Sequence, residues 1–97
     1  MRFISISRPL NDAGMDQFAP YLDAEVRYGW QNYKDGTFRD IYFRQDVLGV
    51  VIMLDADDQA AAEAAVAGFP LAKAGLIAFD TIPVGPFTNW EMLFASA

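Results

Sequence analysis

The sequence predicts an α+β fold in which two helices cover one face of a four-stranded antiparallel sheet. Four short segments have the alternation or the apolar, β-branched composition of strands. Two further segments have the spacing or the capping residues of helices, and the six elements follow the order βαββαβ within 97 residues. Hydrophobic residues make up 54% of the chain, which is enough for a packed core and excludes a disordered chain.

The first half of the chain contains one strand and one long helix. Apolar and polar residues alternate over residues 3–7, which predicts the first strand, and a loop follows between Pro9 and Gly14. From residue 15 onward apolar residues recur every three or four positions, which predicts one helix of about five turns that Gly36 ends. The apolar stripe of this helix consists of Met15, Phe18, Leu22, Val26, Trp30 and Tyr33.

Two strands joined by a tight turn are expected next. Residues 37–44 are β-branched, aromatic and alternating. Residues 48–54 are nearly all apolar, as in a central strand that is covered on both faces. Gln45 and Asp46 between them are expected to form a short hairpin connection.

The remaining elements are a second helix, a last strand and a tail. Asp58 precedes an Ala-rich helix over about residues 58–67, so we interpret the acidic run before it as helix-capping rather than metal-binding. The last strand is expected over about residues 76–82. This is the ferredoxin-like order, which we expect for the whole chain, 1–97, as a single domain with an apolar C-terminal tail at about residues 87–97.

Strand periodicity divides the sheet residues between two faces. We expect the helices to cover the more apolar set: Ile4, Ile6, Ile41, Phe43, Val50, Ile52, Ile77 and Phe79. The opposite face then carries a mixed set: Ser5, Ser7, Phe38, Asp40, Tyr42, Arg44, Val51, Met53, Leu76, Ala78 and Asp80. This second face is too apolar to be left to water, so we expect a homodimer in which two such faces enclose a small-molecule pocket.

Charge and missing residue types exclude several classes of function. Seven Lys and Arg against thirteen Asp and Glu give a net charge of −6, so no nucleic acid and no membrane is expected as a partner. The chain has neither Cys nor His, which excludes thiol catalysis, Cys-ligated metals and imidazole bases. No run approaches the roughly 18 apolar residues of a membrane span, and the start lacks a signal-peptide core, so we expect a cytoplasmic protein.

Carboxylates, tyrosines and arginines must then carry any chemistry. Asp80 and Asp40 are candidate bases, because a carboxylate beside aromatic residues and away from water accepts a proton more readily. Arg44 can hold a substrate carboxylate, and Tyr42 can donate a hydrogen bond to a developing enolate. The competing interpretation is structural: an Arg–Asp pair that closes the dimer or neutralises itself at a strand edge, and a tyrosine packed with its hydroxyl satisfied.

The segment Gly36-Thr37-Phe38-Arg39-Asp40-Ile41-Tyr42 resembles the muconolactone isomerase family, which has Gly-Thr-aromatic-Arg-x-aliphatic-aromatic on the same strand. The resemblance continues in Phe69-Pro70-Leu71 after the second helix and in the aspartate at Asp80 on the last strand. It implies a dimeric α/β barrel, assembled in some members into larger rings, that needs no cofactor. The type enzyme of the family shifts a double bond within an unsaturated carboxy-lactone during aromatic catabolism.

The resemblance and this proton-shuttle chemistry together give a candidate site. The expected catalytic residues are Asp80, as base, with Asp40 and Tyr42, and the expected substrate-binding residues are Arg39, Arg44, Phe38, Met53 and Trp30. Arg39 or Arg44 would hold the substrate carboxylate. The sequence departs from the type enzyme at Asp40, where that enzyme has histidine, and it lacks that enzyme's basic residues between Ser5 and Gly14.

We therefore expect a cofactor-free isomerase that shifts a double bond in a small unsaturated lactone or ring. Two alternatives stay open: a non-catalytic dimeric barrel that binds a small molecule, and a cofactor-independent monooxygenase of the antibiotic-biosynthesis type. Three observations distinguish these hypotheses. An isomerase turns over without oxygen, a binding barrel shows a ligand-induced rise in melting temperature without turnover, and a monooxygenase takes up oxygen.

Overall fold

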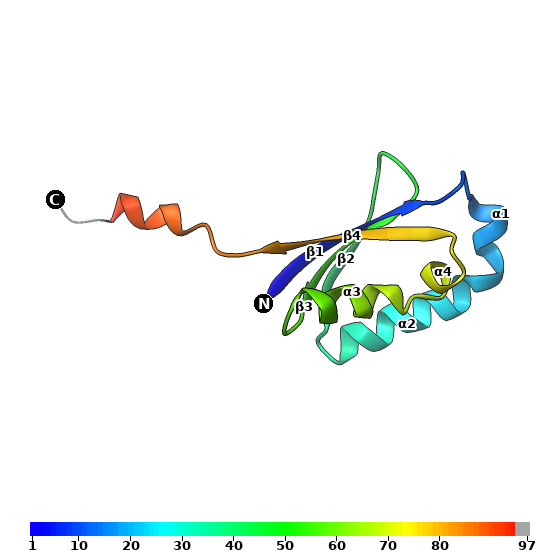
Figure 1. The fold of residues 1–97 in the computed structure, drawn as a ribbon, viewed down its shortest axis with the longest axis horizontal. Coiled ribbons are helices and arrows are strands. Elements are labelled where there is room, and N and C mark those ends of the chain that lie inside the picture. Colours follow the sequence, from blue (N-terminus) through cyan, green and yellow to red (C-terminus); the bar gives the residue numbers. More distant parts are fainter. Residues whose placement is uncertain (95–97) are drawn as a thin grey trace.

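The computed structural model describes residues 1–94 and shows a four-stranded antiparallel sheet with helices on one face (Figure 1). In chain order the elements are β1 (Arg2–Pro9), α1 (Met15–Phe18), the 3₁₀ turn η1 (Ala19–Tyr21), α2 (Leu22–Lys34), β2 (Phe38–Phe43), β3 (Val50–Asp55), α3 (Gln59–Ala67), α4 (Pro70–Lys73), β4 (Ile77–Val84) and the 3₁₀ helix η2 (Thr88–Leu93). The predicted α+β, ferredoxin-like fold class is confirmed. Within residues 1–94, none of the helices has the length and apolar character needed to cross a membrane.

The sheet has the strand order β2-β3-β1-β4, so β2 and β4 are its edge strands. Arg2 at the start of β1 pairs with Val84 at the end of β4 and with Asp55 at the end of β3. Phe38, the first residue of β2, pairs with Leu54 beside it. The end of β4 and the start of β2 therefore lie at the same end of the sheet, on opposite edges.

The predicted first helix is interrupted at Pro20. Residues 15–18 form α1, a 3₁₀ turn follows, and α2 begins at Leu22. Proline has no backbone N–H and its ring clashes with the preceding turn of an α-helix, so a continuous helix through this position is disfavoured. The expectation of one unbroken helix is wrong at this point, although the residues of its apolar stripe still lie on one side of α1 and α2.

The core between the helices and the sheet is aromatic. The ring of Phe69 stacks on Phe38 at 5.5 Å and on Phe79 at 5.6 Å between centroids, and Tyr28 meets it edge-on at 4.8 Å. The fully buried side chains of this core come from three strands and α3: Phe3, Phe38, Ile52, Leu54, Ala62 and Val66. A smaller cluster of Ala13, Phe18, Leu71 and Ile77 extends the core towards α1.

The expected faces of β1 are wrong, because its serines and not its isoleucines point towards the helices. Ser5 and Ser7 are 0% and 1% exposed. The Ser5 hydroxyl forms a hydrogen bond with the Thr81 hydroxyl at 2.8 Å, and the Ser7 hydroxyl accepts one from the Val50 amide at 2.8 Å. These bonds offset the free-energy cost of burying the two hydroxyls. Because Phe3 alternates with Ser5 and Ser7 along β1, it lies on the same face and packs in the core.

Phe38 was expected on the uncovered face and is instead fully buried in the core. The register of β2 against β3 shifts between Phe38 and Asp40, so one residue is left over in β2. This irregularity puts Phe38 on the helix side while Ile41 and Phe43, further along, also face that side, as predicted.

The connection between β2 and β3 is longer than the expected two-residue turn, since it spans residues 44–49. At the other sheet end β4 continues through Pro83 to Val84, which an edge strand tolerates. The chain then leaves the sheet and forms η2, which lies apart from the helices and gives the molecule extents of 60 × 29 × 20 Å (Figure 1). Residues 95–97 of the predicted tail lie outside the described residues.

Candidate functional site

A groove of about 730 Å³ lies on the helix side of the sheet, between α1 and α2 and the strands β2 and β3. Its walls are mostly apolar, and the largest side chains come from α2 and β2: Leu22, Val26, Trp30, Tyr33, Ile41 and Phe43. Four polar or charged residues also line it: Ser7, Glu25, Arg39 and Asp40. An apolar groove of this size with few polar groups is typical of a small-molecule site.

Glu25 is the partly buried acid of this groove. It lies on α2 between Leu22 and Gly29, one turn from each, so the helix turns it to the same side as these lining residues. Its Oε1 accepts a hydrogen bond from the Leu71 amide at 2.9 Å. Burial raises the pKa of Glu25, and the Leu71 hydrogen bond offsets part of that rise. The carboxyl is therefore a better proton acceptor than an exposed glutamate.

Sequence reasoning missed Glu25. A signal was present, because the acid stands between the apolar positions Leu22 and Val26 of the helix stripe and four residues before Gly29. A charged residue that an apolar stripe partly buries needs a partner or a function.

Three predicted residues do line the groove: Trp30, Arg39 and Asp40. Trp30 stacks on Tyr33 with ring centroids 5.8 Å apart, and the Lys34 ammonium lies 6.0 Å from its ring. Arg39 is exposed, and its Nε lies 3.9 Å from the Asp55 carboxylate, so the two form a long and solvent-exposed ion pair. An aromatic wall and a cation thus meet at one end of the groove.

Arg44 serves the loop between β2 and β3. It donates to both oxygens of Asp46, at 3.0 and 2.7 Å, and to the Ser7 carbonyl at 3.1 Å. The Arg44 hydrogen bonds lower the pKa of Asp46 to about 2, with help from the Val47 amide. Gly49 closes this loop at φ +158°, where an added Cβ would lie 2.5 Å from the Ser7 carbonyl oxygen.

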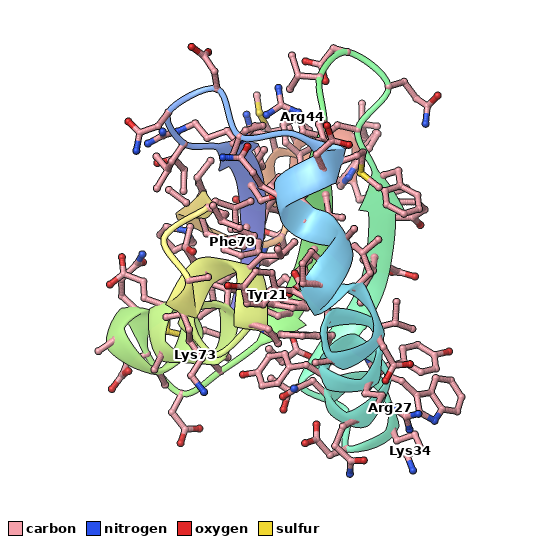
Figure 2. All side chains as sticks on the ribbon, turned by 90° about the vertical axis from the view of Figure 1, so that its right-hand side faces the viewer. Tyr21, Arg27, Lys34, Arg44, Lys73 and Phe79 are labelled. Carbon is pink, nitrogen blue, oxygen red and sulfur yellow. The ribbon has the colours of Figure 1, made fainter. Side chains whose placement is uncertain are left out.

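Figure 2 shows Arg44 beside this loop and Arg27 and Lys34 on α2, at opposite sides of the molecule. Arg44 therefore does not join the cations of α2 around one ligand. Its predicted role as a carboxylate anchor stays a prediction, and in this structure its hydrogen bonds are used within the loop.

Asp80, Tyr42 and Met53, in contrast, do not line the groove. Asp80 lies on β4 with its carboxylate 3.4 Å from Arg8, while Asp40 lies on β2 at the opposite sheet edge, so the two candidate bases are not brought together. Tyr42 and Met53 lie on the sheet face that the helices leave uncovered, in register with Ile4 and its neighbours. Their catalytic and binding roles stay predictions.

That uncovered face is apolar along its centre. Its central side chains are Ile4, Ile6, Val51, Met53 and Ile82. Arg2 with Asp55 at 2.6 Å and Arg8 with Asp80 flank this strip. Among residues 1–94, no three acidic side chains gather closely enough to hold a metal ion.

The chain is similar to known proteins in its family and in its fold. No curated protein matches the sequence. The solved structure of 5-chloro-2-hydroxyhydroquinone dehydrochlorinase (TftG) from Burkholderia phenoliruptrix AC1100, in complex with 2,5-dihydroxybenzoquinone, has a similar fold. The TM-score is 0.69 at 18% sequence identity, covering 88% of this chain and 94% of that one. The YCII-related domain matches residues 3–88, and this chain belongs to that family.

Proposed function

We propose that the groove is the active site of a cofactor-free enzyme that moves a proton on a small oxygenated or unsaturated ring, with Glu25 as acid and base. The observation that carries the proposal is the partly buried Glu25 carboxyl, whose pKa is raised inside an apolar groove. A base of this kind can remove a proton from a carbon beside a carbonyl group. The ring would lie against Trp30, with Arg39 near an anionic oxygen.

Two outcomes can follow the first proton transfer. The C–H bond breaks, its electron pair enters the ring as an enolate, and the proton stays on Glu25. Return of that proton to a different ring carbon shifts the double bond, which is the isomerisation expected from the sequence. Loss of a leaving group such as chloride from the neighbouring carbon instead gives an elimination, and Glu25 then releases its proton to water.

The dehydrochlorinase with the similar fold carries a small dihydroxyquinone ligand, which supports a ring of this size and oxygen content as substrate. Aromatic catabolism is the matching setting. We keep isomerisation as the first expectation and elimination as the alternative, because both need the same base and the same enolate stabilisation.

Solvent exchange tests the proposal directly. The protein is incubated in deuterated water with a β,γ-unsaturated carboxy-lactone and, separately, with 2,5-dihydroxybenzoquinone, and ring C–H signals are followed by proton NMR. We expect enzyme-dependent deuterium incorporation that falls by roughly 10²–10⁴ in the Glu25→Gln variant. Glu63→Gln, at an exposed position on α3, is the matched control and should retain exchange.

The same assay separates the competing assignments. If Asp80→Asn abolishes exchange while Glu25→Gln does not, the chemistry lies on the uncovered sheet face. Exchange by neither probe, together with a ligand-induced rise in melting temperature, would make the groove a binding site without catalysis.

We also propose a homodimer in which two uncovered sheet faces pack together. The apolar strip at the centre of the uncovered face, which includes Ile4 and Ile82, supports a second copy of the chain as partner, because a monomeric protein seldom leaves such a strip exposed to water. The flanking pairs of Arg2 with Asp55 and Arg8 with Asp80 would form a polar rim. Sedimentation equilibrium gives the mass, and a monomer at micromolar concentration would contradict this assembly.

A further inference from the structure

The segment after β4, residues 85–94, is an apolar tail that the rest of its own chain leaves exposed. Its big apolar side chains are 62–82% exposed: Phe87, Trp90, Met92, Leu93 and Phe94. Phe87 and Trp90 meet edge-on at 5.2 Å, so the tail presents an ordered aromatic surface. Figure 1 shows this tail leaving the sheet in line with β4 and pointing away from α2.

A second exposed apolar surface lies at one end of the groove. Trp30 is 58% and Tyr33 52% exposed, although they stack on each other and line the site. They belong to the last turns of α2, and Arg39 at the start of β2 lies at the same end of the groove. The proposed active site is therefore open where its aromatic wall and its cation are found.

The register shows how the two surfaces can meet. The last residue of β4, Val84, and the first of β2, Phe38, lie at the same end of the sheet but on opposite edges. If two sheets pack face to face about a two-fold axis parallel to the strands, β4 of one copy comes beside β2 of its partner. Strand directions are kept by that rotation, so the tail leaves β4 at the end of the partner's β2 where that strand begins, and it reaches the partner's groove on the helix side by passing over this edge strand.

We propose that, in the homodimer, the apolar tail of each copy covers the open end of the other copy's groove, so that each active site is completed by the partner chain. This inference rests on the proposed function and on the proposed dimer. Because the two copies are related by a two-fold axis, the contact of one tail with the partner's groove is repeated by the other tail, so both tails are buried and both grooves are covered.

Area and charge both favour a second copy as the occupant. Aromatic residues bury roughly 150–250 Å² each, so three from each tail add several hundred Å² to the interface of the two sheets. The tail carries one charged residue, Glu91, and the open end of the groove carries Lys34 and Arg39. To reach this site in its own chain, the tail would have to reverse direction and cross the width of the sheet.

Cross-linking tests the contact without reference to turnover. The chain has no cysteine, so single cysteines can be introduced without background. An Asn89→Cys variant is mixed with a Lys34→Cys variant, left to exchange subunits, and treated with a short bis-maleimide. We expect a covalent heterodimer, and a several-fold lower yield when Lys34→Cys is replaced by Lys73→Cys, an exposed lysine on α4.

A double variant separates contact between copies from contact within one chain. Asn89→Cys and Lys34→Cys are combined in one chain, which is diluted with a large excess of wild type and treated in the same way. Loss of the cross-link supports the proposal, because the wild-type partner offers no cysteine. An intramolecular cross-link that persists on dilution overturns it, since the tail then folds back on its own groove.

Failure of this inference can be distinguished from failure of the proposed function. A dimer by sedimentation that gives no cross-link in either format overturns the tail contact alone, and a monomer overturns both tail and dimer. Normal cross-linking without deuterium exchange overturns the chemistry and leaves the contact in place.

Discussion

Gly29→Ala is expected to stabilise the protein and weaken ligand binding at the same time. Gly29 is buried in the interior of α2 and forms part of the groove wall. A Cβ at this position would lie 3.6 Å from Ile41 Cδ1 and 3.8 Å from Phe69 Cε1, which are ordinary van der Waals distances. The added methyl group therefore fits without displacing either neighbour.

The magnitude follows from two contributions. Alanine is favoured over glycine in a helix interior by about 1 kcal/mol, and burying one more carbon adds up to about 0.8 kcal/mol. The free energy of unfolding should therefore rise by about 1–2 kcal/mol. For a domain of this size each kcal/mol corresponds to about 4–8 °C in melting temperature, so the increase should exceed the error of a calorimetric scan.

The methyl group also takes space from the ligand. One carbon in an apolar pocket changes binding by roughly 1–3 kcal/mol, so the dissociation constant for 2,5-dihydroxybenzoquinone should rise at least about fivefold by titration calorimetry. Gln31→Gly, at an exposed position of the same helix, is the control: it should lower stability by about 1 kcal/mol and leave affinity unchanged. A less stable Gly29→Ala variant, or one with unaltered affinity, would refute this description of the groove wall.

Three further predictions concern single charged residues. Burial raises the pKa of Glu25 above its ordinary 4.5, so the folded state loses stability as pH rises through that region, and Glu25→Gln should remove this loss in urea titrations at pH 4 to 7. Arg44 lowers the pKa of Asp46 to about 2, so the stability that this carboxylate adds to the folded state is fully present above its ordinary pKa of 3.8 and is lost as pH falls towards 2. The melting temperature of Asp46→Asn should therefore fall less steeply than that of the wild type over this acid range. Asp58 caps α3 by accepting from the Ala61 amide at 2.8 Å, so Asp58→Ala should cost about 1 kcal/mol in denaturant unfolding, and an unchanged midpoint would contradict the cap.

The order of the elements could be predicted because its signals are local. Asp58 before an Ala-rich run predicts a helix start, and the structure places the cap there. Gly36 was expected to adopt a left-handed conformation after the first helix, and its φ is +88°. Such signals involve residues a few positions apart, so the sequence shows them directly.

The faces of β1 could not be predicted, because Ser5 and Ser7 are buried through partners distant in the sequence. Thr81 is 76 positions from Ser5, and Val50 is 43 positions from Ser7. Alternation alone makes Ile4 the better core residue, and only the paired strands reveal that the hydroxyls are satisfied. The shift in β2 that buries Phe38 likewise depends on pairing with β3.

The site could be predicted only in part. The pocket was expected on the uncovered sheet face, whereas the groove lies on the helix side; Trp30, Arg39 and Asp40 line this groove, and the expected base, Asp80, lies on the uncovered face. Glu25 was missed because an acid on an amphipathic helix is normally solvated, and its burial depends on α4 packing over it through the Leu71 amide.

The two proposals are linked by the physical cause of Glu25's basicity. Burial is what raises the pKa of this carboxyl, and the groove is open to water beside Trp30 and Tyr33. A partner tail that covers this opening would remove further water, strengthening both the basicity of the carboxyl and the attraction of Arg39 for an enolate oxygen. Assembly would then do more than bury the apolar tail, because a monomer with the same groove residues would hold a weaker base in a wetter site.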